Sequence, residues 1–256
     1  MSEKTRTYKG IRITGDKESN VSDELTVEEA LTIFLNDDPL TVTMQTPGNE
    51  LELARGLLFT EGILKSRTED FPAKVAETNK SGNITAIRVQ LDGVQASAIS
   101  KRSLLSVSAC GICGKTEIDF VTGKLESTGL ANFDLIPQMF DQMKDSQQAF
   151  LSSGGCHAAA AFNSKGKMLS VREDVGRHNA VDKVIGALLF EGRLSEARFL
   201  LVSGRVSYEI IAKTFAAGIP VLAAVSAPSS LAVDFCKELG ITLFGFCREN
   251  RMTRYS

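Results

Sequence analysis

Two cysteines, separated by two residues, lie in the segment Ser108–Lys115, which reads Ser-Ala-Cys-Gly-Ile-Cys-Gly-Lys. A thiolate at either position would be stabilised by the neighbouring S–H group and by the positive charge of Lys115. The two glycines widen the backbone's conformational range and let a large partner approach closely. The segment therefore predicts a mobile loop in which Cys110 and Cys113 carry reactive thiols.

The same spacing has two other interpretations. Cys-x-x-Cys is a common half-site for structural zinc, which takes four nitrogen or sulfur ligands. The remaining cysteines and histidines form no second pair of that kind, although Cys156 and His157 could still complete such a site. A thioredoxin-like centre should instead open a helix directly after a strand, and Gly114 is a poor helix opener. A zinc-stabilised binding module and a dithiol oxidoreductase therefore stay open as alternatives.

Length and composition describe an ordinary globular chain. The 256 residues include 43% hydrophobic and 23% charged residues, with a net charge of −2 and five cysteines. An odd cysteine count argues against a disulfide framework, and the polar first ten residues do not resemble a signal peptide. No apolar run reaches membrane-spanning length. We therefore expect a cytoplasmic protein with no membrane association and no bulk nucleic-acid binding.

The hydrophobic pattern predicts two structural units. Residues 1–24 are expected to be an N-terminal tail, and residues 25–107 a small α+β domain with a β-hairpin at 31–44, a helix at 49–60 and a strand at 84–91. Residues 108–133 form the cysteine loop and a connection. Residues 134–256 open with a helix at 134–151 and a hairpin at 156–171. A helix at 179–190 then leads into alternating short apolar strands and helices, which are typical of parallel strands in an α/β/α sandwich.

Polar residues follow the last three predicted strands, where ligands bind in open α/β sheets. Two of these strand ends, Ser203-Gly204-Arg205 and Ser226–Ser230, lead into predicted helices, whose free N–H groups attract anions. The third end includes Cys247-Arg248-Glu249-Asn250-Arg251. Each feature alone fits a helix cap or a solvated charge, but their coincidence predicts a pocket for a phosphorylated or nucleotide-like ligand.

A second polar run, Arg172–Asn179, precedes an amphipathic helix and contains Arg177 and His178. His157, after two glycines, is in a comparable setting, although a lone histidine is more often structural. Zinc deaminases need a His-x-Glu sequence and a downstream Pro-Cys-x-x-Cys. Neither histidine is followed by that glutamate, so deaminase chemistry is argued against, and we expect no bound metal.

Four motifs resemble the FdhD family of formate dehydrogenase accessory sulfurtransferases, also called sulfur carrier proteins. The similarity runs from about residue 25 to the C-terminus, and the run at 172–183 is very specific. The matching segments are Cys110–Lys115, Gly154–Ala160, Arg172–Lys183 and Ser203–Glu209. Cys156 departs from the pattern, because an apolar residue is expected there.

The resemblance implies a cytidine-deaminase-like C-terminal domain and a cytoplasmic homodimer. It also implies that a cysteine desulfurase gives a sulfane sulfur to Cys110 as a persulfide, with Cys113 assisting. The recipient would be the molybdenum (or tungsten) bis-guanine-dinucleotide cofactor of formate dehydrogenase, held as a substrate, with no permanent cofactor. The expected cofactor-binding residues are Ser203, Gly204, Arg205, Phe246, Cys247, Arg248, Glu249, Asn250 and Arg251, supported by His157, Arg177 and His178.

Overall fold

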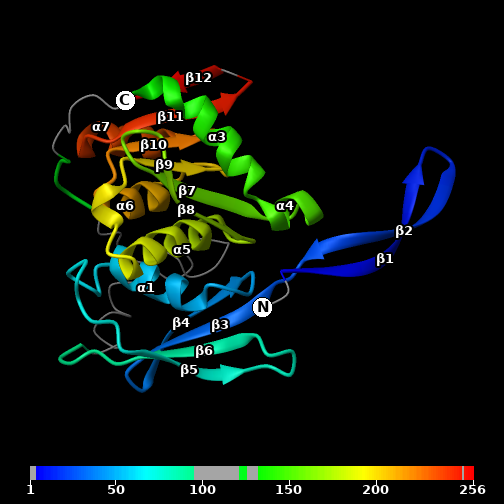
Figure 1. Ribbon diagram of the computed structural model, residues 1–256, viewed down its shortest axis with the longest axis horizontal. Helices are drawn as coiled ribbons and strands as arrows, with labels where there is room; N and C mark the ends of the chain where they lie inside the picture. Colours follow the sequence, from blue (N-terminus) through cyan, green and yellow to red (C-terminus); the bar gives the residue numbers. More distant parts are fainter. Residues whose placement is uncertain (1–3, 95–120, 126–131, 250) are drawn as a thin grey trace.

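The computed structural model describes residues 4–94, 121–125, 132–249 and 251–256. Within these residues the strands form a two-stranded, a four-stranded and a six-stranded sheet. Figure 1 shows the two larger sheets at opposite ends of the body with helices between them, while the two-stranded hairpin projects to one side. No helix in the described part of the chain is long and apolar enough to cross a membrane.

The first residues do not form the expected tail. They form an antiparallel hairpin of two ten-residue strands, β1 (Thr5–Thr14) and β2 (Lys17–Thr26), joined by the two-residue turn Gly15-Asp16. Gly15 has φ 61°, a conformation that glycine adopts at little cost. Most side chains of both strands are exposed, so the hydrophobic pattern that marks a half-buried strand is missing. The Gly-Asp turn was the available signal.

The four-stranded sheet has the order β4-β3-β6-β5 and is covered on one face by α1 (Glu50–Thr60). The expected hairpin at 31–44 and the strand at 84–91 are present in it, and β5 was not predicted. Its apolar residues Leu31, Ile33 and Leu35 are fully buried, as their alternation indicated. The strands are β3 (Glu29–Leu35), β4 (Asp38–Gln45), β5 (Ala73–Thr78) and β6 (Ile84–Val89).

The six-stranded sheet has the order β12-β11-β10-β9-β7-β8. Strands β9, β10 and β11 are parallel, whereas β7, β8 and β12 pair antiparallel with their neighbours. The three parallel strands were expected, and β12 was not. The strands are β7 (His157–Phe162), β8 (Met168–Asp174), β9 (Phe199–Val202), β10 (Val221–Ala224), β11 (Thr242–Arg248) and β12 (Arg251–Arg254).

Helices cover both faces of this sheet, which is the α/β/α arrangement that the sequence predicts. One face packs against α3 (Ile136–Asp145), through Ile136, Met139 and Met143. The other face packs against α5 (Arg177–Phe190), α6 (Tyr208–Ala216) and α7 (Ser230–Leu239). Two short 3-10 helices lie at Phe133–Leu135 and Leu194–Glu196.

The predicted helix at 134–151 is two helices. Helix α3 ends at Asp145, and α4 (Gln148–Ser153) begins after Ser146 and the buried Gln147. The N–H groups of Ala149 and Phe150 at the start of α4 donate to the Glu173 carboxylate, at 2.9 and 2.8 Å. A carboxylate from β8 therefore caps the second helix, and no local pattern reveals such a cap.

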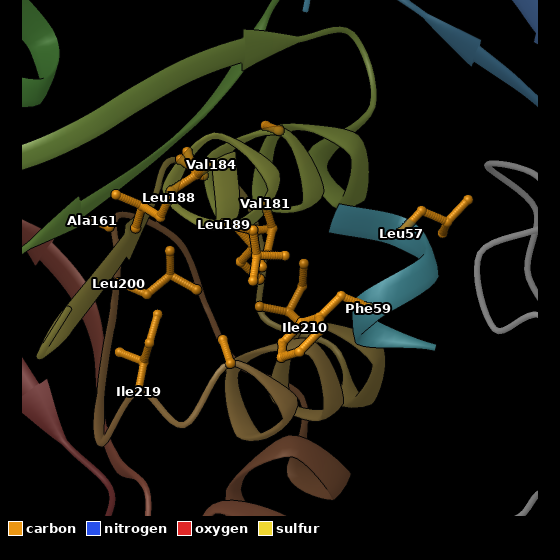
Figure 2. Packing of buried hydrophobic residues seen from close by; sticks show 14 of the residues in the cluster. Leu57, Phe59, Ala161, Val181, Val184, Leu188, Leu189, Leu200, Ile210 and Ile219 are labelled. Atoms are coloured by element: carbon orange, nitrogen blue, oxygen red, sulfur yellow. The ribbon is translucent and has the colours of Figure 1, made fainter. Parts of the chain in front are cut away.

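Helices α1 and α5 cross so closely that only glycine fits at the contact. A Cβ on Gly56 would lie 1.9 Å from the Asp182 carbonyl oxygen, and one on Gly186 would lie 1.8 Å from the Glu52 carbonyl oxygen. Figure 2 shows Phe59 of α1 beside Ile210 of α6. One hydrophobic cluster includes residues from both larger sheets and from α1, α5, α6 and α7. The two halves of the chain thus share a continuous core.

Candidate functional site

A cavity of about 630 Å³ lies at the ends of the central strands, on the α3 side of the six-stranded sheet. One wall is α3 with Gln147 and Phe150, and another is the end of β11 with the start of β12. Ser203 follows β9 and Val225 follows β10, so the carboxyl ends of all three parallel strands contribute. We call this space the strand-end cavity. It is at the edge of the sheet where the sequence predicts a ligand.

The structure brings six of the predicted residues together around this cavity. These are His157, Ser203, Cys247, Arg248, Glu249 and Arg251. Gly204, Arg205, Phe246, Arg177 and His178 are not among its lining residues. Cys110, Cys113 and Asn250 lie outside the described residues.

The cavity wall formed by the end of β11 and the start of β12 carries Arg248 and Arg251, and we call it the arginine wall. Arg248 donates from Nε to the Val225 carbonyl oxygen at 3.0 Å, which ties the end of β11 to the end of β10. A bulge lies between Gly245 and Arg248, and a Cβ on Gly245 would come within 2.8 Å of the Pro228 ring. The guanidinium group of Arg248 stays at the exposed rim of the cavity, where an anionic ligand can reach it.

Phe246 adopts an unusual conformation beside this wall. Its φ is 54°, and its N–H donates to the Ser226 carbonyl oxygen at 3.2 Å. A non-glycine residue pays about 1–2 kcal/mol for this left-handed conformation. The side chain is nevertheless 44% exposed, so burial of the ring does not offset that cost. Strain of this kind concentrates at functional sites.

The described cysteines are all buried thiols. Burial raises the pKa of Cys247 to about 11 and that of Cys236 to about 12. Burial also raises the pKa of Cys156, whose Sγ lies 3.5 Å from the Thr26 hydroxyl. Cys156 and Cys247 both line the strand-end cavity, yet they stay protonated at neutral pH and are weak nucleophiles there.

No group of three His, Cys, Asp or Glu side chains that could hold a metal ion occurs in the described ranges. The pairing of Cys156 with His157 therefore gains no third ligand from this part of the chain. The Cys110–Cys113 half-site lies outside these ranges.

The two histidines lie near the first turns of α5 and α6. His178 forms a hydrogen bond between Nε2 and the Ser207 hydroxyl at 3.3 Å, and its pKa is lowered to about 4 by burial and by Lys213 and Arg177. His157 also has a lowered pKa, because of burial and the charges of Arg177 and Arg205. Burial and the cations around them therefore keep both imidazoles neutral.

His157 connects this region to the strand-end cavity. His157 lines the cavity. It also lies close to Gly204, because a Cβ added to Gly204 would be 3.2 Å from Nδ1 of His157 and 3.4 Å from the Arg177 Cβ. The β9–α6 connection therefore packs closely against His157 at Gly204. The predicted group of Ser203, Gly204 and Arg205 is divided: Ser203 lines the cavity, and Arg205 acts electrostatically on His157.

The most specific motif, Arg172–Lys183, mainly joins the two halves of the chain. Arg172 forms a two-pronged ion pair with Glu52 of α1, at 2.6 and 2.8 Å. Lys183 contacts Asp174 at 2.7 Å and donates to the Thr46 carbonyl oxygen, also at 2.7 Å. These contacts give the motif a structural role, which its polar composition alone did not reveal.

Asp182 completes this connection from the middle of α5. It contacts Lys213 of α6 at 2.8 Å and accepts a hydrogen bond from the Thr60 hydroxyl at 2.8 Å. Burial raises the pKa of Asp182 to about 6, although Lys213 and Thr60 both favour its charged form. We call the contacts of Arg172, Asp174, Asp182, Lys183 and Lys213 with their partners the α1–α5 joint.

The sequence interpretation missed the wall that α3 contributes. Ile136, Pro137, Phe140, Asp141 and Lys144 all line the strand-end cavity. The helix was predicted from its apolar residues, and Ile136, Met139 and Met143 do face the sheet. Which of the remaining side chains face a ligand depends on where the helix lies across the strand ends, and a helical pattern does not contain that information.

The fold and the cavity define an α/β protein with a cavity at the carboxyl ends of its parallel strands. The chain belongs to the FdhD/NarQ family, whose model matches residues 26–256. A sulfur carrier protein FdhD from Streptomyces avermitilis is 41% identical, covering 100% of this chain and 95% of the relative. One from Mycolicibacterium paratuberculosis is 44% identical, covering 91% and 89%. One from Saccharolobus solfataricus is 35% identical, covering 100% and 98%.

The fold also matches a crystal structure assigned to a formate dehydrogenase accessory protein from Desulfotalea psychrophila. The TM-score is 0.76 at 22% sequence identity, with 99% of this chain and 97% of the other chain covered. At this identity the match supports the shared fold. Family membership rests on the family model and on the relatives.

Proposed function

We propose that this chain is a sulfur carrier that serves formate dehydrogenase. It accepts a sulfane sulfur from a cysteine desulfurase and passes it to the molybdenum (or tungsten) bis-guanine-dinucleotide cofactor of that enzyme. Near full-length relatives named as sulfur carrier proteins support the proposal. The structural observation that carries it is the strand-end cavity, whose rim presents Arg248 and Arg251 to an anionic, nucleotide-sized ligand.

The loading step is a thiol exchange that needs no external oxidant. The Cys110 thiolate attacks the outer sulfur of the persulfide on the desulfurase, and the sulfur–sulfur bond of the donor breaks. The donor cysteine leaves as a thiolate, and Cys110 becomes the persulfide. Lys115, five residues along the chain, would favour the attacking thiolate form.

Release of the sulfur involves Cys113 by one of two routes. In the first, Cys113 takes the outer sulfur from Cys110 and relays it. In the second, the Cys113 thiolate attacks the inner sulfur of the Cys110 persulfide and displaces hydrosulfide. The second route leaves a Cys110–Cys113 disulfide, so the two thiols supply the two electrons that reduce the sulfur. A cellular thiol reductant must then restore the pair.

The cofactor is a bound substrate in this proposal, and its guanine-dinucleotide arms occupy the strand-end cavity. Arg248 and Arg251 contact phosphate oxygens, with Ser203 beside them on the cavity wall. Phe246 does not line the cavity, but its exposed ring, near the end of β11, offers a stacking surface to a base that extends beyond the cavity. His157 lines the same cavity, and the charges of Arg177 and Arg205 act on it.

The remaining expectations belong to the same proposal. The protein acts in the cytoplasm as a homodimer, with a cysteine desulfurase as donor and formate dehydrogenase as recipient. Its C-terminal part is of the cytidine-deaminase-like type, without a permanent cofactor or metal. The α/β/α arrangement, with the first turns of α5 and α6 beside His178 and Ser207, is compatible with that assignment.

Intact-mass measurement tests the sulfur step. Wild type, Cys110→Ala and Cys113→Ala are incubated with a cysteine desulfurase and cysteine, and each mass is recorded before and after addition of a reductant. We expect one reducible added sulfur on wild type and on Cys113→Ala, and none on Cys110→Ala. Cys156→Ala is the matched control. Burial raises the pKa of the Cys156 thiol, so this thiol should not accept the sulfur and the variant should load as wild type does. A persulfide retained on Cys110→Ala, within the loop peptide, would reject the assignment.

A further inference from the structure

A carboxylate lies on the wall of the strand-end cavity that α3 contributes. Asp141 is exposed and lines the cavity, and it forms no hydrogen bond or ion pair with any described residue. It is the only acidic residue among the α3 residues on that wall. The other acidic lining residue, Glu249, lies next to Arg248 at the end of β11. The α3 wall thus carries Asp141 with one cation, Lys144, whereas the wall at the end of β11 carries Glu249 between two arginines, Arg248 and Arg251.

This arrangement suits one nucleobase in particular. Guanine presents two neighbouring donors, N1–H and the 2-amino group, on one edge. An ionised carboxylate has two acceptor oxygens and no donor, so it can accept both hydrogen bonds at once. Adenine has no such pair of donors, and hypoxanthine lacks the 2-amino group. A carboxylate in the same cavity as phosphate-binding arginines is therefore suited to recognising guanine.

We propose that Asp141 determines the base specificity of the strand-end cavity by accepting hydrogen bonds from N1–H and the 2-amino group of guanine. The proposal rests on the proposed function, in which Arg248 and Arg251 hold the phosphates. Glu249 is a poorer candidate, because its carboxylate lies in the arginine wall and would repel the phosphates there. Phe140 and Phe150 on the α3 side provide apolar surface for the faces of a base.

The substitution Asp141→Asn gives a test with an expected gain of binding. An asparagine keeps one acceptor for N1–H but presents an amide donor where guanine has its 2-amino group. Xanthine carries a carbonyl oxygen at that position, which can accept from the amide. The variant should therefore bind GDP about 10- to 100-fold more weakly and xanthosine diphosphate more tightly than wild type does. Inosine diphosphate, which keeps N1–H alone, should be affected less than GDP.

The measurement is isothermal titration calorimetry of the full chain with GDP, inosine, xanthosine and adenosine diphosphates. Asp145→Asn is the matched control, because Asp145 is exposed on the same helix and is not a lining residue. It should bind all four ligands as wild type does.

The outcomes separate the two proposals. A switch from guanine to xanthine in Asp141→Asn alone supports the assignment. If wild type binds GDP but Asp141→Asn loses affinity for all four ligands equally, or for none, the assignment of Asp141 is wrong and the cavity's role stands. If wild type binds no guanine nucleotide, the guanine site of the proposed function fails, and the assignment of Asp141 fails with it.

Discussion

The α1–α5 joint and the strand-end cavity are both rich in charged residues, but they treat those charges differently. In the joint, Asp174 pairs with Lys183 and Asp182 with Lys213, with all four side chains at most 2% exposed. In the cavity, Asp141 forms no hydrogen bond or ion pair with the residues that the structure describes, and among the same residues the Arg248 guanidinium donates to the Val225 carbonyl oxygen. Buried charges that pair with one another become part of the scaffold, because loss of one leaves the other uncompensated, whereas charges at the edge of a cavity remain available to a ligand.

The largest effect should come from breaking the joint. Lys213→Ala leaves the fully buried Asp182 carboxylate without its cation, which should lower the free energy of unfolding by about 3–5 kcal/mol. Urea denaturation followed by circular dichroism measures the loss. Arg193→Ala is the control, because its ion pairs with Glu191 and Glu196 are exposed to solvent and should contribute far less. If both variants lose the same unfolding free energy, the buried ion pairs of the joint matter no more for stability than exposed ion pairs do.

The matching experiment on the cavity should change binding and leave stability alone. Arg248→Ala removes a charge-assisted contact, so GDP should bind with about 1.5–3 kcal/mol less free energy, while the urea midpoint stays within error. Arg198→Ala is the control, because Arg198 precedes β9 at the opposite end of the sheet. If Arg248→Ala lowers stability as much as affinity, the arginine belongs to the scaffold.

Acidification should lower the free energy of unfolding of the protein through His178. Its folded-state pKa of about 4 is below the usual 6.5, so the unfolded chain binds the proton more tightly. The stability that this histidine contributes is therefore present above pH 6.5 and is lost as the pH falls toward 4. Between pH 7 and 5, wild type should lose about 2 kcal/mol more than His178→Gln.

The groups around His178 decide how cleanly this difference is seen. Lys213, Arg177, Glu209 and His157 act on it electrostatically. Asp182 titrates in an overlapping range with the opposite sign, because its pKa is raised to about 6. Comparing the variant with wild type at each pH cancels that contribution. Identical pH profiles for the two proteins would show that His178 is not responsible.

The smallest expected effect on stability concerns the positive φ of Phe246. Phe246→Gly relieves the positive φ, whereas Phe246→Ala keeps it, and both variants lose the ring. The glycine variant should therefore be more stable than the alanine variant by about 1 kcal/mol in thermal unfolding. Both should bind GDP more weakly than wild type if the ring stacks on the base. Wild-type affinity in both variants would show that the strain does not serve this ligand.

Much of the fold follows from local patterns in the sequence. The alternation at Leu31, Ile33 and Leu35 predicted a buried strand face, and the apolar run Phe199–Val202 predicted a central strand. The hairpin β1–β2 was missed because its strands bury almost nothing, so the hydrophobic alternation is absent. The break between α3 and α4 was missed because its cap, Glu173, comes from another part of the chain.

The candidate site was predicted only in part, for a similar reason. Residues that come after a predicted apolar strand, such as Ser203, Arg248 and Arg251, could be assigned to one edge of the sheet once the strands were predicted parallel. Phe140 and Asp141 could not be assigned, because they come from a helix, α3, that ends more than 50 residues before the first of those strands, β9. Family resemblance located the motif Arg172–Lys183 without revealing that most of its charges are structural.

The sequence by itself determined the parallel strands, the strand ends and the family, because periodicity, turn residues and motifs are local properties of the chain. Tertiary structure alone decided which charges are paired and which are free. Asp182 and Asp141 are the same chemical group, but one lies under a helix crossing beside Lys213 and the other faces a cavity. Solvent access and the distance to the nearest opposite charge separate them, and both quantities exist only once the chain has folded.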